Sequence, residues 1–166
     1  FGNAAIGASR ALGMRRAKVT NSIVACDRSP KARKVALDLG IVNQATKDYA
    51  KAVAGADLVV IATPVLSYGA IAKAIAGHLK PGAIVSDVGS VKASVLTAMA
   101  KHLPANVHFI PAHPVAGTEN SGPDSGFAEL FINRWCILTP PDGAYPAAVE
   151  KRTAFWPGLR ANVEIM

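Results

Sequence analysis

The chain has 166 residues, the size of one ordinary domain, and carries a net charge of +7. Hydrophobic residues make up 51% and charged residues 17% of the chain, a balance that excludes a disordered polypeptide. The longest apolar run, residues 58–66, is much shorter than the roughly 20 residues that a membrane-spanning helix needs.

The excess positive charge lies at the N-terminal end of the chain. Residues 1–34 contain eight basic residues and one acidic residue, whereas the remainder is neutral overall. Such a region is compatible with a nucleic acid, an anionic cofactor or solubility alone. Residues 1–16 show no cationic leader followed by an apolar stretch, so we expect a cytoplasmic protein with no membrane partner.

Short β-rich apolar runs alternate with longer segments rich in Ala, Lys and Leu, which is the pattern of an α/β protein with a parallel sheet. In chain order the sequence predicts a helix at 6–16, a strand at 22–26, helices at 31–39 and 49–53, a strand at 58–62, a helix at 66–78, a strand at 83–88, a helix at 91–102, strands at 107–111 and 135–138, a helix at 146–156 and a strand at 163–165. Cys26 and Cys136 each lie in an apolar run, so we expect two buried thiols rather than a disulfide or a metal site.

The first predicted helix follows a variant of the dinucleotide-binding turn G-x-G-x-x-G, with alanine at the middle position. In that turn the glycines allow a tight bend and a close approach of the pyrophosphate, while the helix N-terminus offers free N–H groups. We expect cofactor contacts from Gly2, Ala4, Ala5, Ile6 and Gly7. The alternative is an ordinary helix start rich in Gly and Ala. Because one residue precedes the turn, we expect a Rossmann-like, doubly wound, mainly parallel sheet without its first strand.

Asp27 strengthens this interpretation, because it ends a predicted strand twenty residues after Gly7, where an acidic side chain binds the adenosine ribose. Arg28 would suit the 2′-phosphate of NADP, but the neighbouring carboxylate would repel that phosphate, so we favour NAD over NADP. Thr63 and Pro64 end the next predicted strand and are expected to border the cofactor. The alternatives are a turn residue at Asp27 and a plain strand terminator at Thr63 and Pro64.

Two further residues follow strands at the expected ligand edge of the sheet. Ser90 is placed to cap the helix at 91–102 and also to touch nicotinamide or substrate. His113 starts the loop after the strand at 107–111, where an imidazole is suited to proton transfer. The other three histidines are expected to be structural or solvated; they are His78, His102 and His108.

Taken together, these motifs resemble the prephenate/arogenate (cyclohexadienyl) dehydrogenase family of tyrosine biosynthesis, across almost the whole chain. The stretches that carry the resemblance are DLVVIATPV at 57–65, DVGSVK at 87–92, HPVAGTENSGPDSGF at 113–127 and NRWCILTP at 133–140. The resemblance implies that residues 1–166 form an NAD-binding domain, incomplete at its N-terminus. It also implies that a helical domain, absent from this chain, supplies homodimer contacts and part of the substrate site in the full-length protein.

The resemblance further implies a reaction. Hydride transfer from the ring hydroxyl of prephenate to NAD, followed by loss of carbon dioxide, would give 4-hydroxyphenylpyruvate; arogenate would give tyrosine. His113 would take the hydroxyl proton, Ser90 would orient that hydroxyl and the nicotinamide, and Thr118 and Glu119 would belong to the substrate site. We expect the isolated chain to show no turnover.

Other readings of the sequence remain open at this point. One is another Rossmann dehydrogenase that acts on a hydroxy acid, against which the stretch HPVAGTE argues. The other is a binding module without catalysis, either for a dinucleotide or for a nucleic acid. A nucleic-acid partner is not expected, because the basic residues alternate with apolar ones and aromatic residues make up only 6% of the chain.

Overall fold

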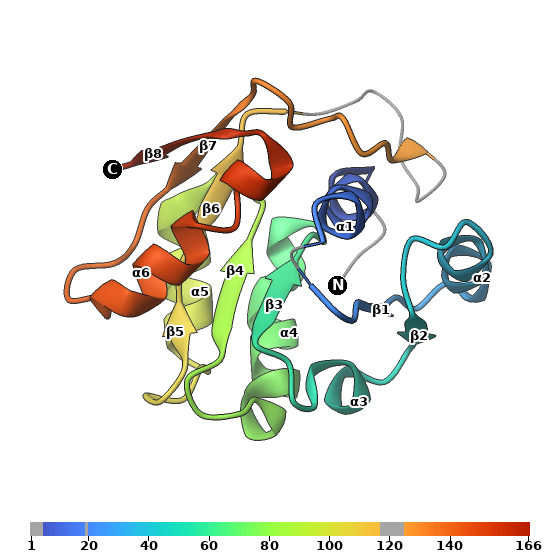
Figure 1. Ribbon diagram of the computed structural model, residues 1–166. Helices are drawn as coiled ribbons and strands as arrows, with labels where there is room; N and C mark the ends of the chain where they lie inside the picture. Colours follow the sequence, from blue (N-terminus) through green and yellow to red (C-terminus); the bar gives the residue numbers. More distant parts are fainter. Residues whose placement is uncertain (1–4, 19, 117–124) are drawn as a thin grey trace.

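The computed structural model describes residues 5–18, 20–116 and 125–166, in which helices and strands alternate (Figure 1). The α-helices are α1 (Ala5–Arg16), α2 (Pro30–Asp38), α3 (Tyr49–Val53), α4 (Tyr68–Ile75), α5 (Lys92–Ala100) and α6 (Pro146–Thr153). The strands are β1 (Val24–Cys26), β2 (Gln44–Thr46), β3 (Leu58–Ile61), β4 (Ile84–Asp87), β5 (His108–Phe109), β6 (Ala112–Pro114), β7 (Trp135–Leu138) and β8 (Asn162–Ile165). The α/β class predicted from the sequence is confirmed.

The strands form three sheets. β1 pairs with β2, and β3, β4 and β5 pair in that order; every pair in these two sheets is parallel. The third sheet has the order β6-β7-β8, in which β6 and β7 are antiparallel and β7 and β8 are parallel. The prediction of mainly parallel pairing is therefore right, and β1-β2 and β3-β4-β5 are separate sheets in the described residues.

The boundary between two of the sheets falls inside one predicted strand. The run at 107–111 is divided, because β5 ends at Phe109 and β6 begins at Ala112. Pro111 lies between them and has no N–H to donate to a ladder. The chain changes sheets at this point, so the residues after Pro111 pair with β7 instead of β4.

Other differences from the predicted elements are local. β2 was missed because its polar sequence, Gln-Ala-Thr, lacks an apolar run. The helix at 66–78 divides into α4 flanked by the 3-10 turns Val65–Ser67 and Ala76–His78, and the helix at 146–156 ends at Thr153, before the 3-10 turn Pro157–Leu159. Cys26 and Cys136 are buried and unbonded, as expected.

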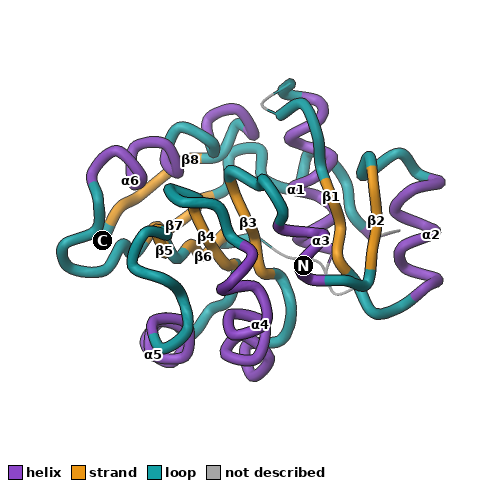
Figure 2. Tube along the Cα trace, turned by 90° about the horizontal axis from the view of Figure 1, so that it is seen from below, coloured by secondary structure: helices purple, strands orange, loops and turns teal. Residues whose placement is uncertain are grey.

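The central sheet is covered on both faces. Figure 2 shows α4 and α5 on one side of the strands and α6 on the other. All four residues of β4 are buried, including the polar Ser86 and Asp87. The main core lies between the sheet and helices α4 and α5, and its fully buried members include Ile61, Tyr68, Ile75, Val85, Val95 and Met99. Among the described helices, none combines the length and the apolar character needed to cross a membrane.

A cavity of about 820 Å³ separates the sheet β1-β2 from the sheet β3-β4-β5. Its walls come from both inner strands, from Ile23 to Cys26 on one side and from Leu58 to Val60 on the other, and from Ala8 and Ala11 of α1. No described strand lies between β1 and β3. The cavity thus runs along the strands β1 and β3, and α1 also contributes Arg10 and Met14 to its lining.

Two arginines are buried beside this cavity. Arg10 of α1 and Arg152 of α6 are only 2% and 1% exposed, and their guanidinium groups lie 4.6 and 4.9 Å from the centre of the Trp156 ring. Arg152 Nε donates to Ser86 Oγ at 3.0 Å, but all the other guanidinium nitrogens of both arginines lack a partner within the described residues. Burial lowers the pKa of Arg10 to about 10, and burial together with repulsion from Arg10 lowers the pKa of Arg152 far more. Both groups are therefore costly cations at neutral pH.

The substitution Arg10→Leu is expected to raise the free energy of unfolding by about 1–2 kcal/mol, because it replaces an unpaired buried cation with an apolar group. The gain falls in the lower part of the usual range, since the cation–π contacts are lost as well. Urea unfolding followed by circular dichroism measures the change. Arg134→Leu, at an exposed arginine, is the matched control and should have little effect. A lower free energy of unfolding for Arg10→Leu would show that the guanidinium has a stabilising partner.

Candidate functional site

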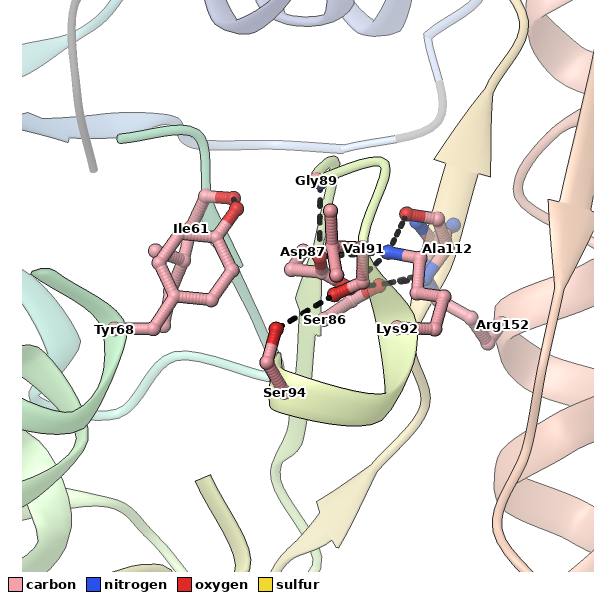
Figure 3. A network of polar contacts seen from close by, with 10 residues as sticks. All are labelled: Ile61, Tyr68, Ser86, Asp87, Gly89, Val91, Lys92, Ser94, Ala112 and Arg152. Atoms are coloured by element: carbon pink, nitrogen blue, oxygen red, sulfur yellow. Dashed lines mark hydrogen bonds and ion pairs between the residues drawn. The ribbon is translucent and has the colours of Figure 1, made fainter. Parts of the chain in front are cut away.

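The candidate site is built around Asp87, the last residue of β4, which is fully buried. Asp87 Oδ2 accepts a hydrogen bond from the N–H of Gly89 at 2.8 Å, and Oδ1 accepts one from the N–H of Ala112 at 3.1 Å. Lys92 Nζ donates to both oxygens, at 2.8 and 2.7 Å. Figure 3 shows the carboxylate between these donors. Four hydrogen bonds thus satisfy a charge that would otherwise be expensive to bury.

Lys92 lies at the start of α5 and completes the network. Its Nζ also donates to the carbonyl oxygen of Ala112 at 2.6 Å, while its side chain remains only 15% exposed. Burial lowers the pKa of Lys92, and the carboxylate of Asp87 acts in the opposite direction by favouring the ammonium form. The result is a buried ion pair that holds both the N–H and the C=O of one residue at the start of β6.

Ser90 lies in the turn after β4 and its side chain is exposed. The expectation that Ser90 caps the following helix is wrong. Val91 is the N-cap residue of α5, and its side chain makes no cap hydrogen bond. The turn is instead held by Asp87 through the N–H of Gly89. The hydroxyl of Ser90 is consequently not used as a helix cap.

His113 lies in β6, opposite Ile137 of β7, and is partly buried. Its ring atom Nδ1 is buried and has no hydrogen-bond partner among the residues that the structure describes. His113 is thus in a short strand, whereas the sequence predicted the start of a loop. Ala112, the residue before His113, is hydrogen-bonded to both members of the Asp87–Lys92 ion pair. The backbone that leads into His113 is therefore held in place.

The predicted cofactor residues lie at the ends of two parallel strands. Asp27 directly follows β1, and Gly7 of α1 and Asp27 both line the cavity between β1 and β3. Asp27 Oδ1 accepts from the N–H of Ser29 at 2.8 Å. Ser67 Oγ lies 2.7 Å from both Thr63 Oγ1 and the carbonyl oxygen of Pro64, and its single hydroxyl proton can serve only one of these two contacts.

The remaining predicted cofactor residues lie in turns or at the start of α1, or fall outside the described residues. Pro64 begins the turn that leads into α4, and Arg28 is exposed beside Asp27. Ala5 and Ile6 begin α1. Four predicted site residues lie outside the described parts of the chain: Gly2, Ala4, Thr118 and Glu119.

Ser90 and His113 each directly follow a residue, Gly89 or Ala112, that is hydrogen-bonded to Asp87. Neither Ser90 nor His113 lines the cavity to which Gly7 and Asp27 contribute. The residues that connect the segments of Ser90 and His113 are Asp87 and Lys92, which were not predicted as site residues. Their presence in the stretch DVGSVK was visible, but the contact with residue 112 spans 25 and 20 positions and has no signature in the local sequence.

A second unpredicted contact fixes the end of the segment that follows His113. The N–H of Phe127 donates to Ser9 Oγ of α1 at 3.0 Å. A β-carbon added to Gly126 would lie 2.6 Å from the β-carbon of Ala8 and 2.9 Å from the backbone nitrogen of Ser9. Only glycine lets the chain approach α1 so closely here.

Comparisons with known proteins show the family to which the chain belongs. The family model described as "Prephenate dehydrogenase, nucleotide-binding domain" matches residues 10–165. The chain is 39% identical over 140 residues to a cyclohexadienyl dehydrogenase of Zymomonas mobilis and 30% identical over 158 residues to a prephenate dehydrogenase of Bacillus subtilis. These alignments cover 84% and 95% of this chain but 47% and 43% of the relatives, so the chain spans about half of their length.

A solved structure gives the same result for the fold. The crystal structure of prephenate dehydrogenase from Aquifex aeolicus in complex with hydroxyphenyl propionate and NAD+ superimposes with a TM-score of 0.91 at 29% sequence identity. The superposition covers 99% of this chain and 57% of the Aquifex chain.

The substitution Gly126→Ala is expected to lower the free energy of unfolding by about 1–3 kcal/mol, the usual cost of overpacking, because the added methyl group meets α1. Chemical denaturation measures the loss. Gly77→Ala is the control, since a β-carbon at Gly77 meets nothing within 4 Å. Equal stabilities of the two variants would show that the contact between Gly126 and α1 is absent in solution.

Proposed function

Because the chain belongs to the prephenate dehydrogenase family, we propose that the whole protein carrying it catalyses the NAD-dependent oxidative decarboxylation of prephenate. Oxidation of the ring hydroxyl and loss of carbon dioxide give 4-hydroxyphenylpyruvate. Arogenate is the alternative substrate and would give tyrosine.

The observation that carries this proposal is the convergence of two segments on one carboxylate. The N–H groups of Gly89 and Ala112 both donate to Asp87, and each immediately precedes a proposed catalytic residue, Ser90 or His113. A hydroxyl and an imidazole are thus carried on backbone that is held on both sides of a single buried group. The fixed backbone supports the proposal that Ser90 orients a substrate hydroxyl and that His113 removes its proton.

His113 is the proposed general base. Its buried Nδ1 has no partner among the described residues, so a ring nitrogen is available to accept or to hold a proton. An imidazole is the side chain most often used as a general base. Removing the hydroxyl proton raises the electron density on oxygen and favours departure of the hydride, an effect worth about 10² to 10⁴ in rate. Ser90 is proposed to orient the same hydroxyl, and Thr118 and Glu119 to complete the substrate site.

The residues at the strand ends suit a nicotinamide dinucleotide. The carboxylate of Asp27 is a fitting acceptor for ribose hydroxyls, and Thr63, which follows β3, is proposed to border the cofactor. The N-terminus of α1, with Gly7 in its first turn, offers N–H groups to phosphates. When bound, NAD supplies the hydride acceptor. We favour NAD over NADP because Asp27 would repel a 2′-phosphate.

We also infer that a parallel strand fills the cavity between β1 and β3. The observed orders β2-β1 and β3-β4-β5 match the doubly wound order 3-2-1-4-5-6 if one further strand stands between them. The apolar walls of the cavity, including Ile23, Val59 and Ala11, suit the side chains of a short apolar strand. This strand would support the turn that leads into α1.

In the whole protein, His113→Asn is expected to lower kcat at least about a hundredfold, since proton transfer loses its base. The dissociation constant for NAD should change little. Steady-state reduction of NAD with prephenate and calorimetric titration of NAD measure the two quantities. His78→Asn, at an exposed histidine, is the control and should retain full turnover. Retained turnover in His113→Asn would refute its catalytic role.

Residues 1–166 alone are expected to bind NAD weakly and to show no turnover. Joining a strand-forming segment of about six apolar residues ahead of Phe1 should tighten NAD binding at least about tenfold, equivalent to about 1.4 kcal/mol. Calorimetry on both versions measures the difference, and a segment of the same length made of Gly and Ser is the control. Micromolar affinity for NAD without the added strand would contradict this inference.

A further inference from the structure

We propose that the Asp87–Lys92 ion pair is a positioning device that holds Ser90 and His113 in their places for catalysis. The proposal rests on the function proposed above, because it presupposes that these two residues act on the substrate hydroxyl. Asp87 and Lys92 are positioning residues, which act through the backbone of their neighbours.

Asp87 joins the two segments that carry the proposed catalytic residues. Its Oδ2 is bonded to the N–H of Gly89 and its Oδ1 to the N–H of Ala112, at 2.8 and 3.1 Å (Figure 3). Because both bonds end on one carboxylate, the turn after β4 and the start of β6 cannot move apart without breaking one of them. The distance between the segments is therefore set by a single side chain.

Lys92 fixes the orientation of the chain that enters His113. Its ammonium has three N–H donors, and the two oxygens of Asp87 and the carbonyl oxygen of Ala112 account for three acceptors. Ala112 is held at its N–H by the anion and at its C=O by the cation of the same pair. The peptide groups on both sides of Ala112 are thereby fixed, and the second of them leads directly into His113.

Burial makes this arrangement hard to replace. Asp87 and Ala112 are fully buried and the Lys92 side chain is 15% exposed, so water has little access to satisfy groups that lose their partners. Charge-assisted hydrogen bonds are also shorter and stronger than neutral ones. A neutral side chain at position 92 leaves both the carboxylate and the carbonyl of Ala112 with unfilled acceptor positions.

The chain contains a matched pair that lacks this connection. Lys80 Nζ lies 2.6 Å from Asp57 Oδ1, with side chains 39% and 69% exposed. Asp57 precedes β3 and Lys80 precedes β4, so this pair lies at the opposite ends of the same strands from Asp87. Lys80→Met therefore removes the same charge from a lysine–aspartate pair without touching the candidate site.

The test compares Lys92→Met with Lys80→Met in the whole protein. Lys92→Met is expected to lower kcat at least about tenfold, because displacing a reacting group by about 1 Å can cost about a hundredfold. The KM for prephenate and the dissociation constant for NAD should stay within about threefold, and Lys92→Arg should restore part of the lost kcat. Lys80→Met should match the wild type. Purely structural damage would lower the folded fraction and would not give this separation of kcat from KM.

Three outcomes decide between the proposals. Normal wild-type turnover with an unchanged kcat in Lys92→Met overturns the positioning role. If the wild-type protein turns over neither prephenate nor arogenate, the proposed function is overturned. The positioning role is then tested by crystal structures of the wild type and of Lys92→Met. Unchanged positions of Ser90 and His113 in Lys92→Met would overturn the positioning role. If Lys92→Met does not fold, Lys92→Gln takes its place, since its amide donates hydrogen bonds without a charge, and a wild-type kcat again overturns the proposal.

Discussion

The buried carboxylate of Asp87 is the point on which the candidate site depends. It receives the ammonium of Lys92 and the amides of Gly89 and Ala112, and so joins the end of β4, the start of α5 and the start of β6. The strands β4 and β6 belong to two different sheets. Removing a buried charge from water is costly, and only complete hydrogen bonding makes it tolerable. The same requirement makes the geometry of the site rigid.

The buried arginines Arg10 and Arg152 differ from Asp87 in how well their charges are hydrogen-bonded. Arg10 and Arg152 are as buried as Asp87, but within the described parts of the chain most of their guanidinium donors meet aromatic faces, such as that of Trp156, and no hydrogen-bond acceptor. Aromatic contact offsets a part of the cost of burying a cation. Among the described residues, the groups of the Asp87–Lys92 pair are fully hydrogen-bonded, whereas most donors of the two buried arginines are not.

Much of the fold was predictable because burial leaves a mark on local sequence. The apolar runs of β3, β4 and β7 identified those strands, and the strand ends located Asp27, Thr63 and Ser90. The sequence-based predictions were wrong for features that depend on contacts with another strand or turn. β2 has no apolar run because its place comes from pairing with β1, and the division of the run at 107–111 reflects a change of partner at Pro111. Ser90 has the right residue type for a helix cap, but Asp87 holds the turn instead.

By itself the sequence determined the α/β class, the family and the residues with chemistry to offer, because these follow from periodicity and from short motifs. Tertiary structure alone decided how they are connected. It showed that the pairing forms three sheets, that a cavity lies between β1 and β3, and that Asp87 and Lys92 hold the backbone beside Ser90 and His113. The reason is physical: a hydrogen bond between residues 20 or 25 positions apart is made by the fold, and neither partner's local sequence records it.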